Sequence, residues 1–226
     1  MKTIVITGTS RGIGLEICKL ALLEGYRVIG LTRNIRPLLE LNNPNLIAHS
    51  VDLSQTSTLK EALDKIFQDI PKVDCLINNA GLLVNKAFQE INLEEIQNSL
   101  AVNFLAPFLL CQTLGTKMDK TGHIVNISTM GAVQGSVKFA GLSIYGSSKA
   151  ALCGLTELLA EEYKENGPRV NALALGAVQT QMLQEAFPDY YTEMSPEKMG
   201  KYILDFAIQG GTYYHGKILP LSNSTP

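Results

Sequence analysis

Hydrophobic residues along this chain fall into short continuous runs that alternate with longer segments in which they recur every three or four positions. Residues 2–8 (KTIVITG) form a run of the first kind, and residues 12–25 (GIGLEICKLALLEG) a segment of the second. Continuous apolar runs predict strands buried on both faces, and the longer spacing predicts helices with an apolar face. Strands are therefore expected at 2–8, 26–32, 45–53, 73–81, 122–129, 168–176 and 216–222, and helices at 12–25, 57–70, 93–117, from about 145 onward and at about 195–208.

The alternation of strands and helices decides the expected fold class. It predicts an α/β, doubly wound architecture, in which a central parallel sheet is flanked by helices on both faces. No linker, repeat or low-complexity tract interrupts the pattern, so we expect residues 1–226 to form a single domain. In the long helix 93–117, Pro107 predicts a kink because proline lacks the backbone N–H that the helix requires.

Composition excludes several classes of protein. The net charge is −2 with acidic and basic residues scattered, which argues against a nucleic-acid partner. No apolar run reaches the eighteen or so residues that cross a bilayer, so no membrane partner is expected. The four cysteines stand singly in apolar segments without metal-ligand spacing, at Cys18, Cys75, Cys111 and Cys153. They predict buried thiols, no metal site and a cytoplasmic protein.

A glycine-rich segment joins the first expected strand to the first expected helix. In TGTSRGIG, residues 7–14, Gly8 permits a tight turn, Gly12 lets the backbone approach a pyrophosphate, and Gly14 lets the helix pack closely on the sheet. The amides and the dipole at the start of the helix favour the phosphate charge. The alternative is a strand–helix turn that merely requires glycines. The spacing Gly-x-x-x-Gly-x-Gly differs from the commonest dinucleotide pattern.

Three motifs in order, TGTSRGIG, NNAG (78–81) and YGSSK (145–149), resemble those of the short-chain dehydrogenase/reductase family. The resemblance covers nearly the whole chain and implies a Rossmann-type domain that exchanges a hydride between a nicotinamide and a small carbonyl or alcohol substrate. It places Asp52 beside the adenine and the loop GAVQT (176–180) at the nicotinamide. The cofactor-binding residues it implies are Gly8, Ser10, Arg11, Gly12, Ile13, Gly14, Thr32, Arg33, Asp52, Leu53, Asn79, Ala80, Gly81, Tyr145, Lys149, Gly176, Val178 and Thr180.

The resemblance also assigns catalytic roles. Tyr145 gives a proton to the carbonyl oxygen during reduction and takes it back during oxidation. Lys149, one helical turn away, is expected to lower the pKa of the phenol from near 10 and to bind the ribose hydroxyls. Asn103 matches an active-site asparagine that holds a water in the proton relay. Taken alone, a Tyr/Lys pair at this spacing is more often a surface contact.

The hydroxyl that polarises the carbonyl is less clearly assigned. The family pattern Asn-Ile-Ser-Ser has its second serine at the position of Thr129 in NISTM, with Ser128 before it. Successive strand residues face opposite sides, so only one of the two can face the substrate, and we favour Thr129. Ser136 and Ser143 are weaker candidates.

The chain departs from the family after its sixth expected strand. Leu175 replaces a usual proline before Gly176, the C-terminal ILPLSNSTP lacks a usual Asp-Gly-Gly, and the expected substrate lid, 181–196, is short. Phe187, Tyr190 and Tyr191 are either lid aromatics or simple packing residues. The sequence therefore leaves the substrate open.

The end of the second expected strand predicts the cofactor. A free ribose hydroxyl favours a carboxylate there, whereas a 2′-phosphate favours a cation. Thr32 occupies the usual acidic position, Arg33 follows it, and Arg11 is a second cation within reach of the same phosphate. Guanidinium groups bind phosphate in a bidentate fork, so we expect NADP(H) rather than NAD(H).

Two alternatives to this enzyme remain. One is a non-catalytic dinucleotide-binding sensor or regulator, and such proteins usually lose the tyrosine or lysine that this chain keeps. The other is a sugar-nucleotide epimerase or dehydratase, which needs a larger domain after the lysine. The resemblance also implies a homodimer or homotetramer that packs through the helices of Asn103 and Tyr145.

Overall fold

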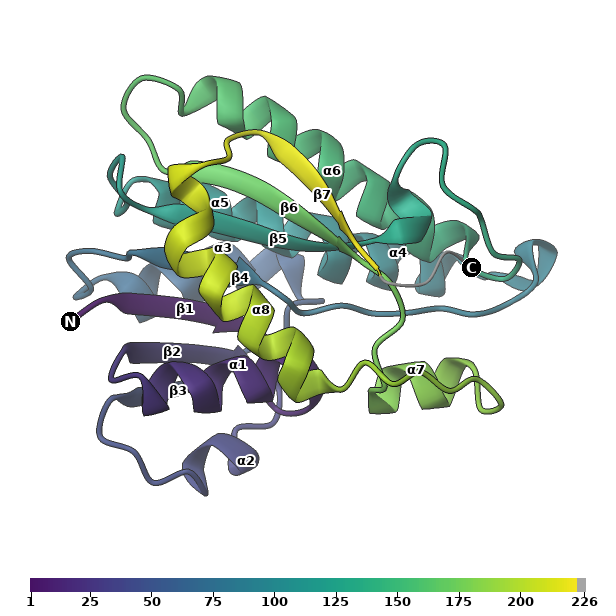
Figure 1. Ribbon diagram of the computed structural model, residues 1–226, viewed down its shortest axis with the longest axis horizontal. Helices are drawn as coiled ribbons and strands as arrows, with labels where there is room; N and C mark the ends of the chain where they lie inside the picture. The colour runs from purple at the N-terminus through teal and green to yellow at the C-terminus, as the bar shows by residue number, and fades with distance from the viewer. Residues whose placement is uncertain (223–226) are drawn as a thin grey trace.

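The computed structural model describes residues 1–222, so the last four residues of the expected domain, 223–226, lie outside the described part. Within it, seven strands form one parallel sheet in the order β3-β2-β1-β4-β5-β6-β7 (Figure 1). The strands are β1 Thr3–Thr7, β2 Arg27–Thr32, β3 Leu46–Ser50, β4 Cys75–Asn78, β5 His123–Thr129, β6 Arg169–Leu175 and β7 Lys217–Leu221. The order reverses between β1 and β4, which is the place where doubly wound sheets open a crevice for ligands.

Helices cover both faces of the sheet, as expected. Helices α1 (Gly12–Leu23) and α8 (Pro196–Gln209) pack together on one face, which is turned toward the viewer in Figure 1. The other face carries α3 (Thr56–Phe67), α5 (Ala106–Gly115) and α6 (Ser143–Glu162). No helix of residues 1–222 combines the length and the apolar character needed to cross a bilayer.

The two hydrophobic cores follow from the alternation of side chains along each strand. In β1, Ile4 and Ile6 enter the core beneath α1 and α8, whereas Val5 enters the core beneath α3 and α5. All three side chains are fully buried. Continuous apolar runs such as the one in β1 are therefore explained by burial on both faces of the sheet, and the expected fold class is confirmed.

The irregularity in the long helix lies elsewhere than expected. The segment consists of α4 (Leu93–Leu100), a π-helical turn (Ala101–Leu105) and α5, so the break precedes Pro107 instead of centring on it. Pro107 stands in the first turn of α5, where a missing N–H removes no hydrogen bond from a regular helix. The wide π turn carries Asn103, and π turns often occur at functional sites.

Two short helices were not expected, α2 (Arg36–Leu39) and α7 (Gln181–Ala186). Each has fewer than two turns, too few for a helical period to be visible in the sequence. Helix α7 lies in the segment expected to be the substrate lid.

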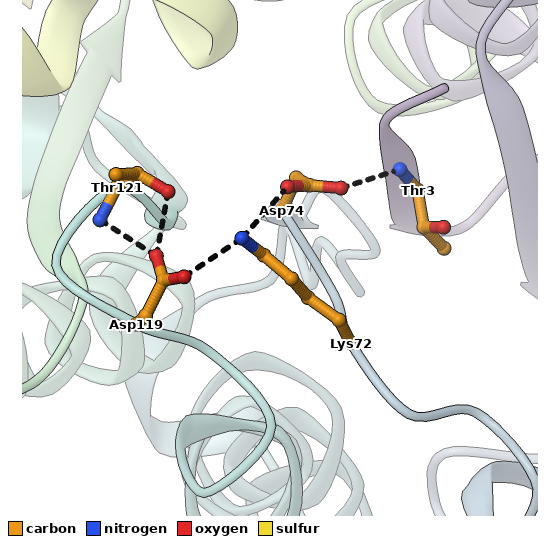
Figure 2. Close-up of polar contacts among 5 residues, drawn as sticks. All are labelled: Thr3, Lys72, Asp74, Asp119 and Thr121. Atoms are coloured by element: carbon orange, nitrogen blue, oxygen red, sulfur yellow. Dashed lines mark hydrogen bonds and ion pairs between the residues drawn. The ribbon is translucent and has the colours of Figure 1, made fainter.

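The amino-terminal edge of the sheet is closed by a polar cluster (Figure 2). The backbone N–H of Thr3 donates to Asp74 Oδ2 over 2.8 Å, and Lys72 Nζ lies 2.7 Å from Asp119 Oδ2 and 3.7 Å from Asp74 Oδ1. Thr121 donates to Asp119 through its N–H and its hydroxyl, and the Lys72 ammonium with these donors lowers the pKa of the Asp119 carboxyl. These contacts join the segments that begin β1, β4 and β5, and they lie at the edge opposite the strands' carboxyl ends.

Candidate active site

A cavity of about 1430 Å³ opens at the carboxyl edge of the sheet. It is lined by the segments that follow β1, β2, β3, β4, β5 and β6, together with the first turns of α6 and helix α7. This volume exceeds the range of about 300–1,000 Å³ that is usual for one drug-sized ligand. It therefore has room for a dinucleotide and a second molecule.

Most of the predicted site residues line this one cavity. The three exceptions are Gly14, Asn103 and Ser128, which are buried behind its wall. Residues that lie as far apart in the sequence as Gly8 and Thr180 thus meet at one place.

The glycine-rich loop is shaped by close backbone packing. Gly8 has a φ of +74°, and a Cβ there would lie 2.9 Å from the Cα of Ala80. Gly12, with a φ of +57°, begins α1, and no side chain caps the amides of its first turn. A Cβ on Gly14 would overlap the carbonyl oxygen of Gly8. The cavity is therefore lined at this point by a helix N-terminus without a side-chain cap, which fits a pyrophosphate.

The segment after β4 is fixed onto this loop. Asn79 Nδ2 donates to the carbonyl oxygen of Thr7 over 2.9 Å, and the N–H of Ala80 donates to Thr7 Oγ1 over 2.9 Å. Deeper in the sheet, Asn78 Nδ2 donates to Asn126 Oδ1 over 2.8 Å. The NNAG motif therefore sets the spacing between β1 and β4 at the point where the strand order reverses.

Tyr145 and Lys149 lie in the first two turns of α6 and line the cavity. Tyr145 is half-buried, and burial raises its pKa to about 12. Lys149 is buried, its Nζ donates to the carbonyl oxygen of Ile127 over 2.7 Å, and burial lowers its pKa to about 8. Desolvation is thus the cause of the shift at Tyr145, and the lowering of this pKa by Lys149 together with the oxidised nicotinamide stays a prediction.

The Asn103 side chain joins three segments. Its Oδ1 accepts from the N–H of Leu82 over 2.9 Å, and its Nδ2 donates to the carbonyl oxygen of Leu82 over 2.8 Å and to Ser148 Oγ over 3.0 Å. Ser148 Oγ in turn donates to the carbonyl oxygen of Tyr145 over 2.8 Å. The side-chain amide of Asn103 is therefore engaged by protein groups, and the role of Asn103 in holding a water of the proton relay stays a prediction.

The two hydroxyl candidates at the end of β5 face different ways. Thr129 lines the cavity. Ser128 is buried, and its Oγ lies 3.2 Å from the Lys149 carbonyl oxygen and 3.2 Å from Cys153 Sγ. Ser136 Oγ is engaged with the carbonyl oxygens of Met130 and Val133, whereas Ser143 lines the cavity at the start of α6.

The predicted ribose and adenine contacts gather at the ends of β2 and β3. Thr32, Arg33, Asp52 and Leu53 all line the cavity. The Ser54 N–H, its hydroxyl and the Arg33 charge hold the pKa of the Asp52 carboxyl below its usual range. Arg33 therefore stands beside a carboxylate at this end of the cavity.

Arg11 is not a free cation at the cavity. Its two terminal nitrogens lie 2.8 and 3.3 Å from the two carboxylate oxygens of Glu185 in α7. The Arg11 guanidinium lowers the pKa of the Glu185 carboxyl. The sequence does not reveal this pair, because α7 is too short to show a helical period.

The loop after β6 completes the cavity. The N–H of Gly176 donates to the carbonyl oxygen of Leu221 over 2.9 Å, and Val178 is buried. Thr180 lies against Gly12 and caps α7, since its Oγ1 accepts from the N–H of Leu183 over 3.2 Å. The same residue thus contacts the glycine-rich loop and begins the lid helix.

Comparison with known proteins agrees with this geometry. The family model of the short chain dehydrogenases matches residues 2–191. The chain is 31% identical over 237 residues to 3-oxoacyl-(acyl-carrier-protein) reductase FabG of Aquifex aeolicus, covering 96% of this chain and 94% of that protein. Similar solved structures include 4-hydroxyisoleucine dehydrogenase complexed with NADH, with a TM-score of 0.89, 24% identity and coverage of 99% of this chain and 98% of that chain. A short chain dehydrogenase of Burkholderia cenocepacia in complex with NADP has a TM-score of 0.86, 24% identity and coverage of 99% and 97%. The chain therefore belongs to the short chain dehydrogenases, a family of oxidoreductases that bind NAD(P).

Proposed function

We propose that the protein is an NADP(H)-dependent oxidoreductase acting on a small carbonyl or alcohol substrate. The observation that carries this proposal is the meeting of Tyr145, Lys149 and Thr129 with the glycine-rich loop at one cavity. Gly8 and Gly14, where a side chain would overlap backbone, pack the loop closely, and Gly12 lines the cavity where a pyrophosphate would approach the backbone. When bound, the nicotinamide supplies the hydride for reduction or accepts it in oxidation.

The cavity residues divide the proton chemistry between them. Thr129 Oγ1 donates a hydrogen bond to the substrate oxygen, and Tyr145 gives its phenolic proton to that same oxygen during reduction. Because burial raises the pKa of Tyr145 to about 12, the protein alone keeps the phenol protonated, which is the form that reduction needs. Lys149, with its pKa of about 8, is mostly a cation at neutral pH and binds the ribose hydroxyls.

Asn103 acts as a positioning residue through Ser148. The hydrogen bonds from Asn103 to Ser148, and from Ser148 to the Tyr145 carbonyl, fix the first turn of α6 against the π turn. Of these three residues only Tyr145 lines the cavity, and Asn103 and Ser148 support it from behind, so loss of this connection shifts Tyr145 relative to the substrate.

Arg33 is the main partner for a 2′-phosphate in this proposal. Arg33 lines the cavity beside Thr32. Because Thr32 is uncharged, no carboxylate at that position repels the phosphate. Arg11 contributes only when the phosphate displaces the Glu185 carboxylate from it. Asp52 and Leu53 then lie beside the adenine.

The assembly and location are part of the same proposal. Residues 1–226 act as one NADP-binding domain, in the cytoplasm, as a homodimer or homotetramer. The oligomer is supported by exposed apolar side chains on the long helices. Leu105 and Phe108 are each 41% exposed, and Leu158 is 67% exposed. Burial of such side chains against a second copy stabilises an oligomer.

An activity screen with one variant tests the function. NADPH consumption is followed with a panel of ketones and aldehydes, for the wild type and Tyr145→Phe. We expect the variant to lose about 10²–10⁴-fold in turnover while its NADPH affinity stays within a few-fold. Equal turnover in both proteins would refute the role of Tyr145. NADPH binding without turnover of any carbonyl would favour the alternative function, a dinucleotide-binding sensor or regulator.

A further inference from the structure

Three exposed aromatic side chains surround the mouth of the cavity. Phe88 precedes α4, Phe139 lies between β5 and α6, and Tyr190 follows α7. They are 73%, 41% and 47% exposed, yet all three line the same cavity as Tyr145. Single exposed aromatic residues need no explanation, but aromatic residues gathered from three segments around one opening mark a ligand surface. We call Phe88, Phe139 and Tyr190 the aromatic collar.

Two hydrogen bonds to backbone carbonyl oxygens, one from a side chain and one from the backbone, join the three segments of the collar. Asn85 Nδ2 donates to the carbonyl oxygen of Ala186 over 2.8 Å, which joins the segment before Phe88 to the end of α7. The N–H of Lys86 donates to the carbonyl oxygen of Gly141 over 3.0 Å, which joins that segment to the one carrying Phe139. Gly141 has a φ of +85°, and a Cβ there would overlap Asn85 Oδ1. The collar is therefore a preformed frame rather than three independent side chains.

The lining of the cavity is mostly apolar, although Gln134 and Ser143 belong to it as well. Its apolar residues include Leu83, Met130, Met182 and Phe187. Lys138 directly precedes Phe139 of the collar. Its Nζ donates to the Val133 carbonyl oxygen over 2.5 Å and to Ser136 Oγ over 2.9 Å, so its ammonium group is already engaged by the protein. Among the described residues that line the cavity, the one carboxylate is Asp52, at the end of β3. A mostly apolar lining offers fewer partners to a polyhydroxylated substrate, whose buried hydroxyls would each need a hydrogen bond, than to a hydrocarbon chain, which needs none.

We propose that the aromatic collar binds the apolar body of the substrate. The preferred substrates are then ketones or secondary alcohols whose hydrocarbon chain or ring extends from the oxygen at Tyr145 to the collar, rather than sugars or sugar acids. This inference rests on the proposed function of the same cavity. It adds the substrate class that the sequence left open.

A series of methyl ketones tests the inference. With saturating NADPH, kcat/KM is measured from 2-butanone to 2-decanone. Each methylene that leaves water contributes about 0.8 kcal/mol, so we expect kcat/KM to rise about fourfold per added methylene until the chain passes the collar. A flat series, or faster turnover of a sugar acid than of 2-decanone, would overturn the proposal.

Two adjacent tyrosines supply a matched pair of variants. Tyr190 lines the cavity, whereas Tyr191 is 75% exposed and does not. Tyr190→Ala is expected to lower kcat/KM for 2-decanone about tenfold and to leave 2-butanone within twofold, while Tyr191→Ala changes neither. Phe139→Ala, in a different segment, should repeat the Tyr190→Ala pattern. Equal effects of the two tyrosine variants would overturn the proposal.

A binding measurement separates failure of the collar from failure of the proposed function. Decanamide and butanamide, which resemble the ketones but are not reduced, are titrated calorimetrically into the NADPH complex. Decanamide should bind at least tenfold more tightly than butanamide, and Tyr190→Ala should remove the difference. Such binding without turnover of any ketone would refute the function and leave the collar standing. Equal binding of the two amides would refute the collar.

Discussion

Replacing Gly14 by alanine tests whether close packing of the glycine-rich loop builds the cofactor end of the cavity. An added Cβ would overlap the carbonyl oxygen of Gly8 and lie 2.5 Å from Asn79 Nδ2. Both neighbours are fixed, because Gly8 is held by its backbone and Asn79 Nδ2 donates to the Thr7 carbonyl oxygen over 2.9 Å. The loop must therefore move away from the segment after β4.

The expected cost follows from these contacts. Forcing a methyl group into a closely packed site typically costs 1–3 kcal/mol, and we expect about 2 kcal/mol for Gly14→Ala. For a chain of this size, that corresponds to a fall of about 4–8 °C in Tm. Because Gly8 and Asn79 also shape the pyrophosphate site, affinity for NADPH should fall at least tenfold.

Gly154 provides the control for this substitution. It lies in α6, and a Cβ there would meet no atom within 4 Å. Gly154→Ala should stabilise the helix by about 0.5–1 kcal/mol and leave NADPH affinity unchanged. Thermal unfolding and equilibrium titration with NADPH measure both variants. Wild-type stability and affinity in Gly14→Ala would refute the packing argument.

Substitutions of individual side chains give further predictions. Thr129→Ala should lower kcat at least tenfold. Ser128→Ala removes a buried hydroxyl outside the cavity and should mainly lower Tm. Equal losses of kcat in the two variants, measured by steady-state kinetics, would contradict this assignment. Glu185→Gln should free Arg11, so the affinity for NADPH should rise by up to about fivefold while the affinity for NADH stays unchanged. Arg33→Asp should weaken the binding of NADPH more than that of NADH. Equal changes for both cofactors in a titration would show that the arginines do not bind the 2′-phosphate. Burial lowers the pKa of His123 to about 4, so between about pH 6.5 and 4 the unfolded chain binds one more proton and the free energy of unfolding falls as the pH falls. Urea unfolding of His123→Gln over this range should show a smaller dependence of the free energy of unfolding on pH. An unchanged dependence would refute this prediction.

The fold was predictable because its strands contain continuous apolar runs. Runs such as residues 2–8 alternate with helical segments, and a sheet buried on both faces is the arrangement that satisfies both patterns. The strand order was not predictable, since parallel pairing leaves no local mark in the sequence. Helices α2 and α7 were too short to show a period, so the Arg11–Glu185 pair was missed with them.

The candidate site was predictable in its motifs but not in its contacts. The glycine-rich loop, NNAG and YGSSK motifs named residues that meet at the cavity. The side-chain directions of Asn103 and Ser128 depend on the π turn and on the pairing of β5, which spacing does not reveal. Burial raises the pKa of Tyr145, and this burial depends on segments far away in the sequence, so the helical spacing to Lys149 does not reveal it.

Thermal unfolding of the wild type with NADPH and, separately, with NADH tests the central claim most directly, because it requires no substrate. Ligand at about a hundred times its dissociation constant adds about 2.7 kcal/mol, which corresponds to a rise of about 5–11 °C in Tm. The account predicts a rise of this size with NADPH and a clearly smaller one with NADH at the same concentration. No rise with either cofactor would contradict it.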